Sequence, residues 1–567
     1  MSKKKNRTFL IKVQIVKTLF YPLIIFLDKI GLMKYSYRSL EKVVRMLGMK
    51  KSINAFLQYR DYSNLFHGDF TASGSYDKGT VLFPAFFGAN SNFTMLDLLF
   101  AKYYAAKGFK PVFLVCNSSI PVCQKENIIR SRKKNLFFCY ECWNGYRKIT
   151  EETGIEIACL NDFKSGSFNE AYAAASAEID RLNTTGECRA YIFRGVPVGE
   201  LTYKSVLRYQ LQGTLENKQR TTVIYRRFMK STVIIYLCFE EFFKKRPDIT
   251  SAIIHNGTLA HEATVRFVCS SRNIPYMTFE TYMGESTVIY KKNNEVMLLD
   301  WAGEMERYFK DNPLTSEMKE EVDRVFSELK VGKHKYAVLN KPVSGEKANP
   351  YGRYVCAFTN LNFDTAVIGK HTIFSDMEDW LMSLVSYWEQ NVSDVRLVIR
   401  VHPAEVKMRS GTREFMGEKL RERIKTGNII LIDSDEKANA YDLIDSMEYG
   451  LVYSSTIGME IAYAGKACVV AGKPYFRDQP FVITPAIRES YFDVIGGLNN
   501  GDIRFTPDSE ALAKMAYYIF RVRLKELTGM KVFTLNAEKN TEFDNSREML
   551  EANISFLDDF DKEFRQV

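Results

Sequence analysis

The sequence predicts an α/β protein made of two consecutive doubly wound domains, each with a parallel sheet covered by helices. Short apolar runs of strand length alternate with stretches of helical spacing over most of the 567 residues. This alternation occurs twice, and a segment without periodicity separates the two runs. The chain is also too long for one ordinary hydrophobic core. We therefore expect two sheets that face one another across a cleft.

The first α/β run is expected over residues 76–335. Residues 78–87 have the continuous apolar character of a buried parallel strand, and the polar loop 88–94 follows them. A helical pattern then ends at Gly108, before a second strand at 111–116. The same patterns predict strands at 190–193, 252–254 and 276–279, and long helices at 215–245 and 258–271.

A linker and a second α/β run follow. Residues 336–352 lose periodicity and collect Lys, Pro, Gly, Ser and Asn, which indicates a linker. The second domain is expected over 353–505, and a helical tail over 506–567. Its predicted strands are 353–360, 396–401, 428–433, 449–455 and 467–472, with helices between them.

The positive charge of the chain is concentrated near its start. Residues 1–60 hold fourteen Lys and Arg but only two acids, Asp28 and Glu41, whereas the whole chain has a net charge of +10. The remainder is therefore close to neutral. A body that binds nucleic acid would spread basic residues over the fold, so no nucleic-acid partner is expected.

The N-terminal segment, residues 1–75, combines this charge with apolar residues. Its longest uncharged run, 18–27, is shorter than the about 20 residues that span a bilayer. We expect a basic amphipathic helical segment on an anionic membrane surface, and hence a cytoplasmic protein, peripheral on the inner face of the cell membrane. The alternative is that residues 9–32 pack on the protein as an extra helix.

Ten cysteines are scattered along the chain. Because no secretory signal precedes them, disulfides are not expected. Cys116, Cys123, Cys139 and Cys142 form a weak candidate for a structural zinc site. Only the last two have the C-x2-C spacing, and Cys116 ends a predicted strand, where a free cysteine is an ordinary core residue. No other metal site is predicted.

Three polar loops of the second domain follow successive predicted strands. They are His402-Pro403-Ala404-Glu405, Asp433-Ser434-Asp435 and the stretch 454–460 (SSTIGME). Successive parallel strands end at the same edge of a sheet, so the three loops are expected side by side.

The third loop has the composition of an anion site. Ser454, Ser455 and Thr456 stand where a helix begins, and hydroxyls together with free N–H groups at a helix start bind phosphate. Gly458 would let a ligand approach the first turn, and Glu460 could accept hydrogen bonds from the hydroxyls of a ribose. The alternative is an ordinary helix cap followed by an acid that the helix dipole favours.

The first two loops add a basic pair and further hydroxyls. Pro403 fixes the turn after the strand, so His402 stays at the strand end and can donate to a phosphate oxygen. Arg400 lies two residues earlier and should point to the same face, while Ser434 belongs to the neighbouring loop. The alternative is a structural histidine at the sheet edge. Arg and His would neutralise a leaving phosphate without a metal ion.

These motifs resemble a known family. RVHPAE at 400–405, the Asp-Ser loop, and YSSTIGMEIAYAGKACVVAGKPYF from 453 are similar to the second domain of bacterial capsule-polysaccharide biosynthesis glycosyltransferases of the Kdo-transferase-like type. The resemblance covers about 353–485 and implies the GT-B architecture, with two Rossmann-like domains, and a CMP-activated sugar donor. In that family the His-Pro pair, the Ser-Ser element and the helix Glu hold the nucleotide. They correspond here to His402, Pro403, Ser454, Ser455 and Glu460.

The first domain is then expected to hold the acceptor. Inverting transfer needs a group that takes the proton of the acceptor hydroxyl. Glu280 and His255 follow predicted strands and are the candidate catalytic residues, with Asn90, Asn92 and Asn256 as candidate cleft residues. His261 and Glu262 lie on the helix after Asn256. Each of these residues could instead be structural.

The sequence thus predicts an inverting, metal-independent glycosyltransferase that needs no cofactor and uses a nucleotide sugar to build a capsule or other surface polysaccharide. Its acceptor would be a glycan or a lipid-linked glycan. One alternative is a CDP-polyol phosphotransferase of the teichoic-acid type. The other is a non-catalytic scaffold of the same architecture in capsule assembly.

Overall fold

The computed structural model describes residues 63–70, 76–86, 91–124, 136–164, 166–332, 351–391, 394–405, 415–436, 438–532 and 541–566. The chain divides into two compact units. The first comprises Met1–Phe168, Leu237–Ala252 and Gly529–Leu557, as far as they are described. The second comprises Asn169–Tyr236, Ile253–Thr528 and Asp558–Val567.

The larger sheet has seven strands in the order β12-β6-β5-β4-β1-β2-β3. Strands β1, β2 and β3 are parallel, β4 is parallel to β1, and β6 runs antiparallel to β5 and β12. Counted along the chain, the first five strands have the doubly wound order 3-2-1-4-5, which reverses direction between β1 and β4. The strands are Thr80–Ala85 (β1), Lys110–Val115 (β2), Glu156–Cys159 (β3), Ile249–His255 (β4), Tyr276–Thr281 (β5), Thr287–Lys292 (β6) and Lys525–Glu526 (β12).

In the first unit a C-terminal helix packs on the first helix after β1. All six residues of β1 are buried, as the apolar run predicted. Lys102 on α4 (Ser91–Ala106) donates to Asp69 Oδ1 at 2.7 Å and to Ser546 Oγ at 2.9 Å. Ser546 begins α20 (Ser546–Ala552), and Phe556 packs on Phe100. Residues far apart in the sequence therefore complete this unit.

The second unit contains a five-stranded sheet in the order β11-β10-β7-β8-β9. Every recorded pairing in it is parallel. This is again the order 3-2-1-4-5, and it reverses between β7 and β10. The strands are Tyr354–Phe358 (β7), Arg396–Arg400 (β8), Ile429–Ile432 (β9), Gly450–Val452 (β10) and Cys468–Val470 (β11).

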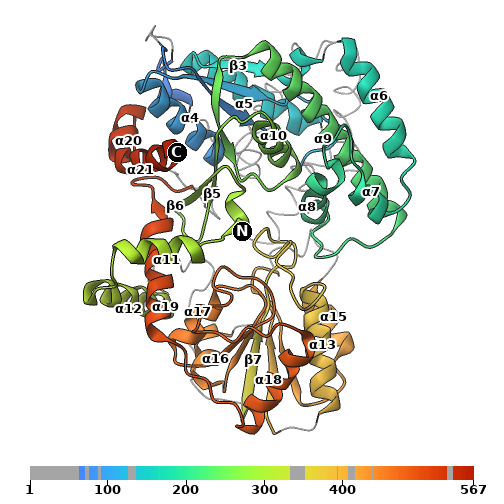
Figure 1. Ribbon diagram of the computed structural model, residues 1–567, viewed down its shortest axis with the longest axis vertical. Coiled ribbons are helices and arrows are strands. Elements are labelled where there is room, and N and C mark those ends of the chain that lie inside the picture. The colour runs from blue at the N-terminus through green and yellow to red at the C-terminus, as the bar shows by residue number, and fades with distance from the viewer. Residues whose placement is uncertain are drawn as a thin grey trace, which may run out of the picture. The chain divides into compact units, whose positions relative to one another are not determined.

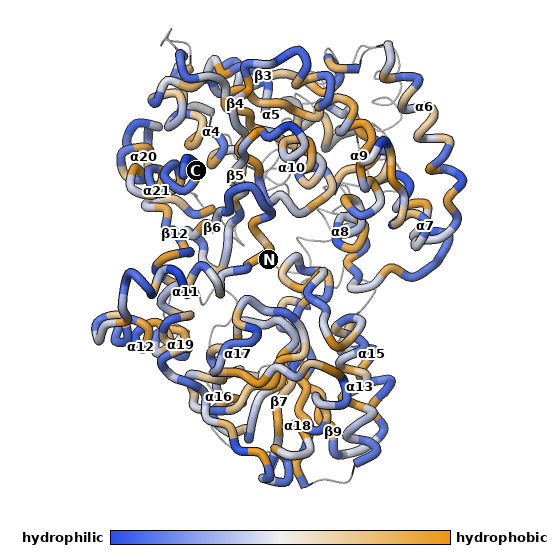
Figure 2. Tube along the Cα trace, in the orientation of Figure 1, coloured by the Kyte–Doolittle hydropathy of each residue, from blue (hydrophilic) through white to orange (hydrophobic). Residues whose placement is uncertain are grey.

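Helices cover both faces of this sheet (Figure 1). Cys356 and Phe358 of β7 belong to one hydrophobic core, with residues of α16, α17 and α19. Val355 and Ala357 belong to another, with residues of α13, α15 and α18. Alternate residues of a strand point to opposite faces, so β7 must be apolar at every position. Figure 2 shows the hydrophobic residues gathered along β7. The helices are Met377–Gln390 (α13), Met416–Arg423 (α15), Ala440–Ser446 (α16), Ile457–Tyr463 (α17), Arg488–Asn500 (α18) and Ser509–Tyr517 (α19).

The remaining helices are Leu136–Thr153 (α5), Gly166–Asp180 (α6), Thr185–Ala190 (α7), Val198–Gln210 (α8), Gln219–Lys245 (α9), Ala260–Ser271 (α10), Ala302–Asp311 (α11), Ser316–Lys330 (α12) and Ile554–Arg565 (α21). Most of them connect strands of the first sheet, and α11 and α12 lie between β6 and β7 in the sequence. Among the described helices, none has an apolar stretch long enough to cross a bilayer.

The predicted fold class is confirmed, and so are all five strands of the second domain. The strand expected at 190–193 is wrong: α7 ends at Ala190, and Phe193 forms only an isolated bridge with Val196. The tail is not wholly helical, because β12 joins the first sheet. The predicted linker falls almost entirely in 333–350, and most of the segment 1–75 that is expected to bind a membrane falls in 1–62; both of these stretches lie outside the described residues.

Gly458 in the first turn of α17 is a packing position. A Cβ there would lie 2.7 Å from Phe476 Cζ and 3.3 Å from Val452 Cγ2. Close packing therefore accounts for a glycine at position 458, and the expected approach of a ligand is not required. The missing side chain lets α17 sit close against β10 and Phe476.

Replacing Gly458 by Ala should destabilise the protein by about 1–3 kcal/mol, because a methyl group would overpack this contact. The matched control is Gly303→Ala in α11, where a Cβ would meet nothing within 4 Å. That change should stabilise its helix by up to about 1 kcal/mol. Thermal unfolding of both variants measures the difference, and equal melting temperatures would contradict the close packing at Gly458.

Candidate functional site

Three loops meet at the carboxyl edge of the second sheet. In doubly wound sheets, ligands bind where the strand order reverses, which here lies between β7 and β10. The loop after β7 begins with Thr359 and Asn360. The His402 N–H donates to Thr359 Oγ1 at 2.9 Å, and the Ser454 N–H donates to Asn360 Oδ1 at 3.3 Å. Two residues that the sequence analysis did not place in the site therefore join the predicted His402 and Ser454 loops.

The imidazole of His402 has a defined hydrogen-bonding role. The N–H of Ala404 donates to His402 Nδ1 at 3.1 Å, so in the neutral ring the proton is on Nε2. Pro403 and Ala404 form a turn, closed by a bond from the Glu405 N–H to the His402 carbonyl at 3.0 Å. His402 can therefore donate a hydrogen bond from Nε2 without being charged.

Two side-chain oxygen atoms in the stretch 454–460, which follows β10, are buried without a hydrogen-bond partner among the described residues. They are Ser454 Oγ and Glu460 Oε2. Burial raises the pKa of Glu460, and a hydrogen bond from Tyr441 opposes that shift. Buried polar atoms in folded proteins are nearly always paired, so such exceptions are candidate ligand contacts. Ser455 and Thr456 beside them are half-buried, and the Thr456 side chain makes no cap bond to α17.

Arg400 and Ser434 hold the loop after β9. The buried Arg400 guanidinium donates to the carbonyl of Asp433 at 2.6 Å and to those of Glu436 and Ala438 at 3.3 and 3.4 Å. Ser434 donates to Asp433 Oδ1 through its N–H at 2.6 Å and its hydroxyl at 3.2 Å. These bonds give both residues a structural role, and direct contact with a phosphate remains a prediction.

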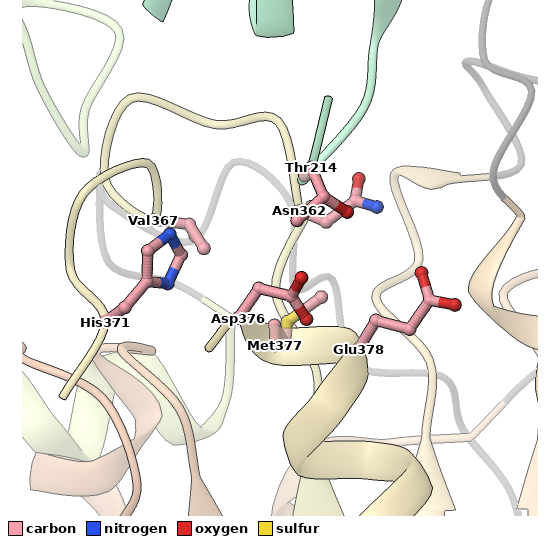
Figure 3. Close-up of a pocket in the computed structure, with 8 residues that line it drawn as sticks. Thr214, Asn362, Val367, His371, Asp376, Met377 and Glu378 are labelled. Atoms are coloured by element: carbon pink, nitrogen blue, oxygen red, sulfur yellow. The ribbon is translucent and has the colours of Figure 1, made fainter. Parts of the chain in front are cut away.

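A pocket lies next to the loop that follows β7 (Figure 3). His371 Nδ1 lies 2.8 Å from the Tyr453 hydroxyl, and burial lowers the pKa of His371, so this ring is neutral at pH 7. Asp376 accepts from the Asp379 N–H at 2.8 Å and so caps α13. The sequence gives no sign of this pocket, because the polar residues that line it do not directly follow a strand. Its lining residues are Gly213, Thr214, Asn362, Val367, His371, Asp376, Met377 and Glu378.

The first sheet brings together the predicted His255, Asn256 and Glu280. Asn256 Nδ2 donates to Glu280 Oε2 at 2.6 Å, and His255 Nε2 lies 3.4 Å from the same oxygen. The N–H and hydroxyl of Thr281 donate to Glu280 Oε1 at 2.8 and 3.1 Å. His255 ends β4, next to the reversal of strand order, and Asn256 adopts a left-handed φ of 58°.

These contacts favour the ionised form of Glu280. Burial alone would raise the pKa of this carboxyl, but the His255 imidazole and hydrogen bonds from His255, Asn256 and Thr281 outweigh it and hold the pKa below its ordinary value. An ionised carboxylate with both oxygens hydrogen-bonded is a weak proton acceptor. The arrangement instead suits Glu280 to orient the imidazole of His255 through Nε2, and both ring nitrogens of His255 are buried.

Glu262 is a buried acid close to this group that the sequence analysis did not select. It lies in the first turn of α10, is 1% exposed, and neither carboxyl oxygen has a partner among the described residues. Burial, opposed by its own backbone N–H and reinforced by the charge of Glu280, raises the pKa of Glu262 to about 8. From sequence alone it looks like an ordinary first-turn acid.

The other candidates form no site among the residues that the structure describes. Asn90 lies outside the described residues, and the side chain of Asn92 in α4 is likewise not described. No three His, Cys, Asp or Glu side chains in the described part of the chain lie close enough to hold a metal ion. Cys116, Cys123, Cys139 and Cys142 are half-buried and form no disulfide, and the Cys142 thiol lies 3.8 Å from the Phe86 carbonyl oxygen.

Two Rossmann-like sheets in one chain define an α/β protein of the GT-B type. No protein-family model matches the sequence, and no curated protein sequence matches it. Two solved structures similar to it are of Thermosulfurimonas dismutans KpsC. The beta Kdo 2,4 transferase has 13% identity and a TM-score of 0.33 over 53% of this chain and 88% of that chain. The beta Kdo 2,7 transferase has 13% identity and a TM-score of 0.32 over 55% and 88%.

A third similar structure is UDP-GlcNAc 2-epimerase from Neisseria meningitidis bound to UDP-GlcNAc. It has 9% identity and a TM-score of 0.23, and the match covers 85% of this chain and all of that chain. Likenesses this weak carry no information about activity. A function therefore has to be inferred from the residues of this chain.

Replacing Glu262 by Gln should change the pH dependence of stability. The pKa is about 8 in the folded protein against an ordinary value of 4.5, so the folded state keeps a proton that the unfolded chain releases. Stability therefore falls as pH rises from about 4.5 to about 8. At neutral pH, Glu262→Gln should be more stable than the parent by up to about 3 kcal/mol, and at about pH 4 the two should match.

Unfolding midpoints measured across this pH range test the expectation. The control is Glu489→Gln, which changes an exposed acid in the first turn of α18 and should leave the pH dependence unaltered. If the parent and Glu262→Gln show the same slope between about pH 5 and pH 8, Glu262 is not a neutral buried acid.

Proposed function

We propose that this protein is a glycosyltransferase that binds a nucleotide-activated sugar at the carboxyl edge of the second sheet. One observation carries the proposal. Where the strand order reverses, Thr359 and Asn360 tie together the loops of His402 and Ser454, and Ser454 Oγ is buried there without a partner. Hydroxyls, a histidine donor and a carboxylate at such an edge suit a nucleotide.

Each of these groups has a role in donor binding under this proposal. His402 donates from Nε2 to a phosphate oxygen, and Ser454 supplies a hydroxyl to the same group. Glu460, one turn into α17, accepts from a ribose hydroxyl. The sequence resemblance to capsule glycosyltransferases favours a CMP-activated sugar, with a glycan or lipid-linked acceptor.

The proposed chemistry is an inverting displacement. The acceptor hydroxyl oxygen attacks the anomeric carbon, the bond from that carbon to the phosphate oxygen breaks, and the nucleotide leaves with both electrons of that bond. His255 Nδ1 takes the hydroxyl proton, while Glu280 holds Nε2–H and stabilises the imidazolium that forms. His402 stabilises the negative charge on the departing phosphate.

The proposed role in surface polysaccharide synthesis is inferred from the sequence alone, namely from the resemblance and from the basic N-terminal segment. The basic N-terminal segment would hold the protein at the membrane where lipid-linked acceptors are found. The CDP-polyol transferase and the scaffold remain alternatives, and none of the contacts described above favours either of them.

A thermal-shift screen with CMP, CDP, UDP and GDP tests donor binding. At least one nucleotide should raise the melting temperature, because a ligand that binds only the folded state stabilises it. Ser454→Ala should weaken that nucleotide about tenfold, through loss of one hydrogen bond to a charged group. His402→Ala should weaken it as well.

The matched control is Ser509→Ala, an exposed serine at the start of α19 in the same unit. It should leave nucleotide affinity unchanged. No stabilisation by any of the four nucleotides, or equal affinity in Ser454→Ala and the parent, would overturn the proposed donor site.

A further inference from the structure

A recess beside the proposed donor site has no role in the binding and transfer steps described so far. It lies where the loop after β7 and the start of α13 meet the connection between α8 and α9 (Figure 3). The space inside it and at its mouth is about 220 Å³. Pockets that hold a whole ligand usually measure about 300–1,000 Å³, so this recess admits only a small part of a ligand.

Two contacts connect the recess to the proposed donor site. The Asn360 N–H donates to Met377 Sδ in the recess at 3.3 Å, while Asn360 Oδ1 accepts from the Ser454 N–H. The hydroxyl of Tyr453, the residue directly before Ser454, lies 2.8 Å from Nδ1 of His371, which also lines the recess. A phosphate bound at Ser454 Oγ would therefore have the recess as a neighbouring space for the sugar attached to it.

Asp376 brings an unpaired acceptor to this recess. The residue is 8% exposed, and its Oδ1 accepts from the Asp379 N–H at 2.8 Å at the start of α13. Its Oδ2 makes no hydrogen bond with the described residues, and this oxygen is accessible, unlike Ser454 Oγ. Figure 3 shows the Asp376 carboxylate in the recess between the side chains of His371 and Glu378. Because a nearly buried carboxylate oxygen without a donor is costly, a ligand that donates to it would be favoured.

The other polar groups around the recess limit what can enter it. Glu378 is paired with Lys419 of α15, whereas Asp376 has no ion-pair partner in the described part of the chain and would repel an anionic group. The His371, Asp376 and Glu378 side chains do not lie close enough together to hold a metal ion. The Thr214 hydroxyl can donate and accept. A charged acceptor beside neutral polar groups suits a hydroxyl group of a sugar.

We propose that the recess binds one hydroxyl group of the sugar that the donor carries, with Asp376 Oδ2 as the acceptor of its hydrogen bond. The inference rests on the proposed function, because the sugar is the one attached to the nucleotide in the donor site. It adds a residue that determines specificity: Asp376 contacts the sugar and takes no part in holding the nucleotide. Thr214 and His371 complete the polar lining around that hydroxyl group.

The test compares nucleotide sugars with their own nucleotides on the full chain. Titration calorimetry gives dissociation constants for CMP, UDP and GDP, and for CMP-N-acetylneuraminate, UDP-glucose, UDP-galactose, UDP-N-acetylglucosamine and GDP-mannose. At least one nucleotide sugar should bind more tightly than its nucleotide. In Asp376→Asn this preference should fall about tenfold, through loss of a hydrogen bond to a charged group, and the affinity for the nucleotide alone should not change. Asparagine also caps helices well, so α13 should keep its start.

The matched control is Asp508→Asn, the same change at the start of another helix. Asp508 is exposed and caps α19 by accepting from the N–H groups of Glu510 and Ala511 at 2.9 Å, so its replacement should alter neither affinity. The inference is overturned if no nucleotide sugar binds more tightly than its nucleotide, if Asp376→Asn keeps the preference of the parent, or if this variant loses both affinities equally. Absence of binding by all three nucleotides would instead overturn the donor site itself, so the two failures are distinguishable.

Discussion

The reversal of strand order around a central strand is the constraint on which both candidate sites depend. In the second sheet β7 lies between β8 and β10 and is buried on both faces, so the chain crosses over one face to β8 and over the other to reach β10. The loops that leave β7 and β10 consequently diverge at the sheet edge, and polar groups can occupy the space between them. Thr359 Oγ1 accepts from the His402 N–H and Asn360 Oδ1 accepts from the Ser454 N–H, so the loop after β7 is tied to the loops after β8 and β10.

The two sheets repeat the same order but present different chemistry at the reversal. The second presents a histidine that donates from Nε2, hydroxyls and the acid Glu460. The first presents a charged carboxylate, a histidine held by it, and a neutral acid. A phosphate is compatible with the second set and is repelled by Glu280 in the first. Under the proposed function, this difference in charge favours a nucleotide at the second sheet and a neutral acceptor at the first.

The sequence predicted the second sheet well because each of its strands is a short continuous apolar run. It did not predict β6 or β3, since β6 ends in two lysines and β3 is half-buried, and neither has the apolar pattern of a central strand. The stretch at 190–193 looked like a strand but is largely exposed, with Ile192 62% exposed. A run of four apolar residues was therefore too short to show that this stretch is a buried strand.

The position of a candidate residue was predictable where it directly follows or ends a strand, as at His402, Ser454 and His255. The sequence does not reveal a side chain that joins two loops by a hydrogen bond, as Asn360 does. Nor does it reveal a residue whose role depends on how deeply it is buried. Arg400 was expected to point at a ligand, but its guanidinium is engaged by three backbone carbonyls. Glu262 was unremarkable in the sequence, and only its burial beside Glu280 sets it apart.

The return of the late segment 525–566 to the first sheet has a consequence for biosynthesis. Strand β12 adds to β6, and Ser546 bonds to Lys102 of α4. During synthesis, β7–β11 and the helices of the second sheet can assemble while the first sheet still lacks its last partners. The part of the protein that is translated first would thus be completed last, and until then α4 would expose the surface that α20 later covers.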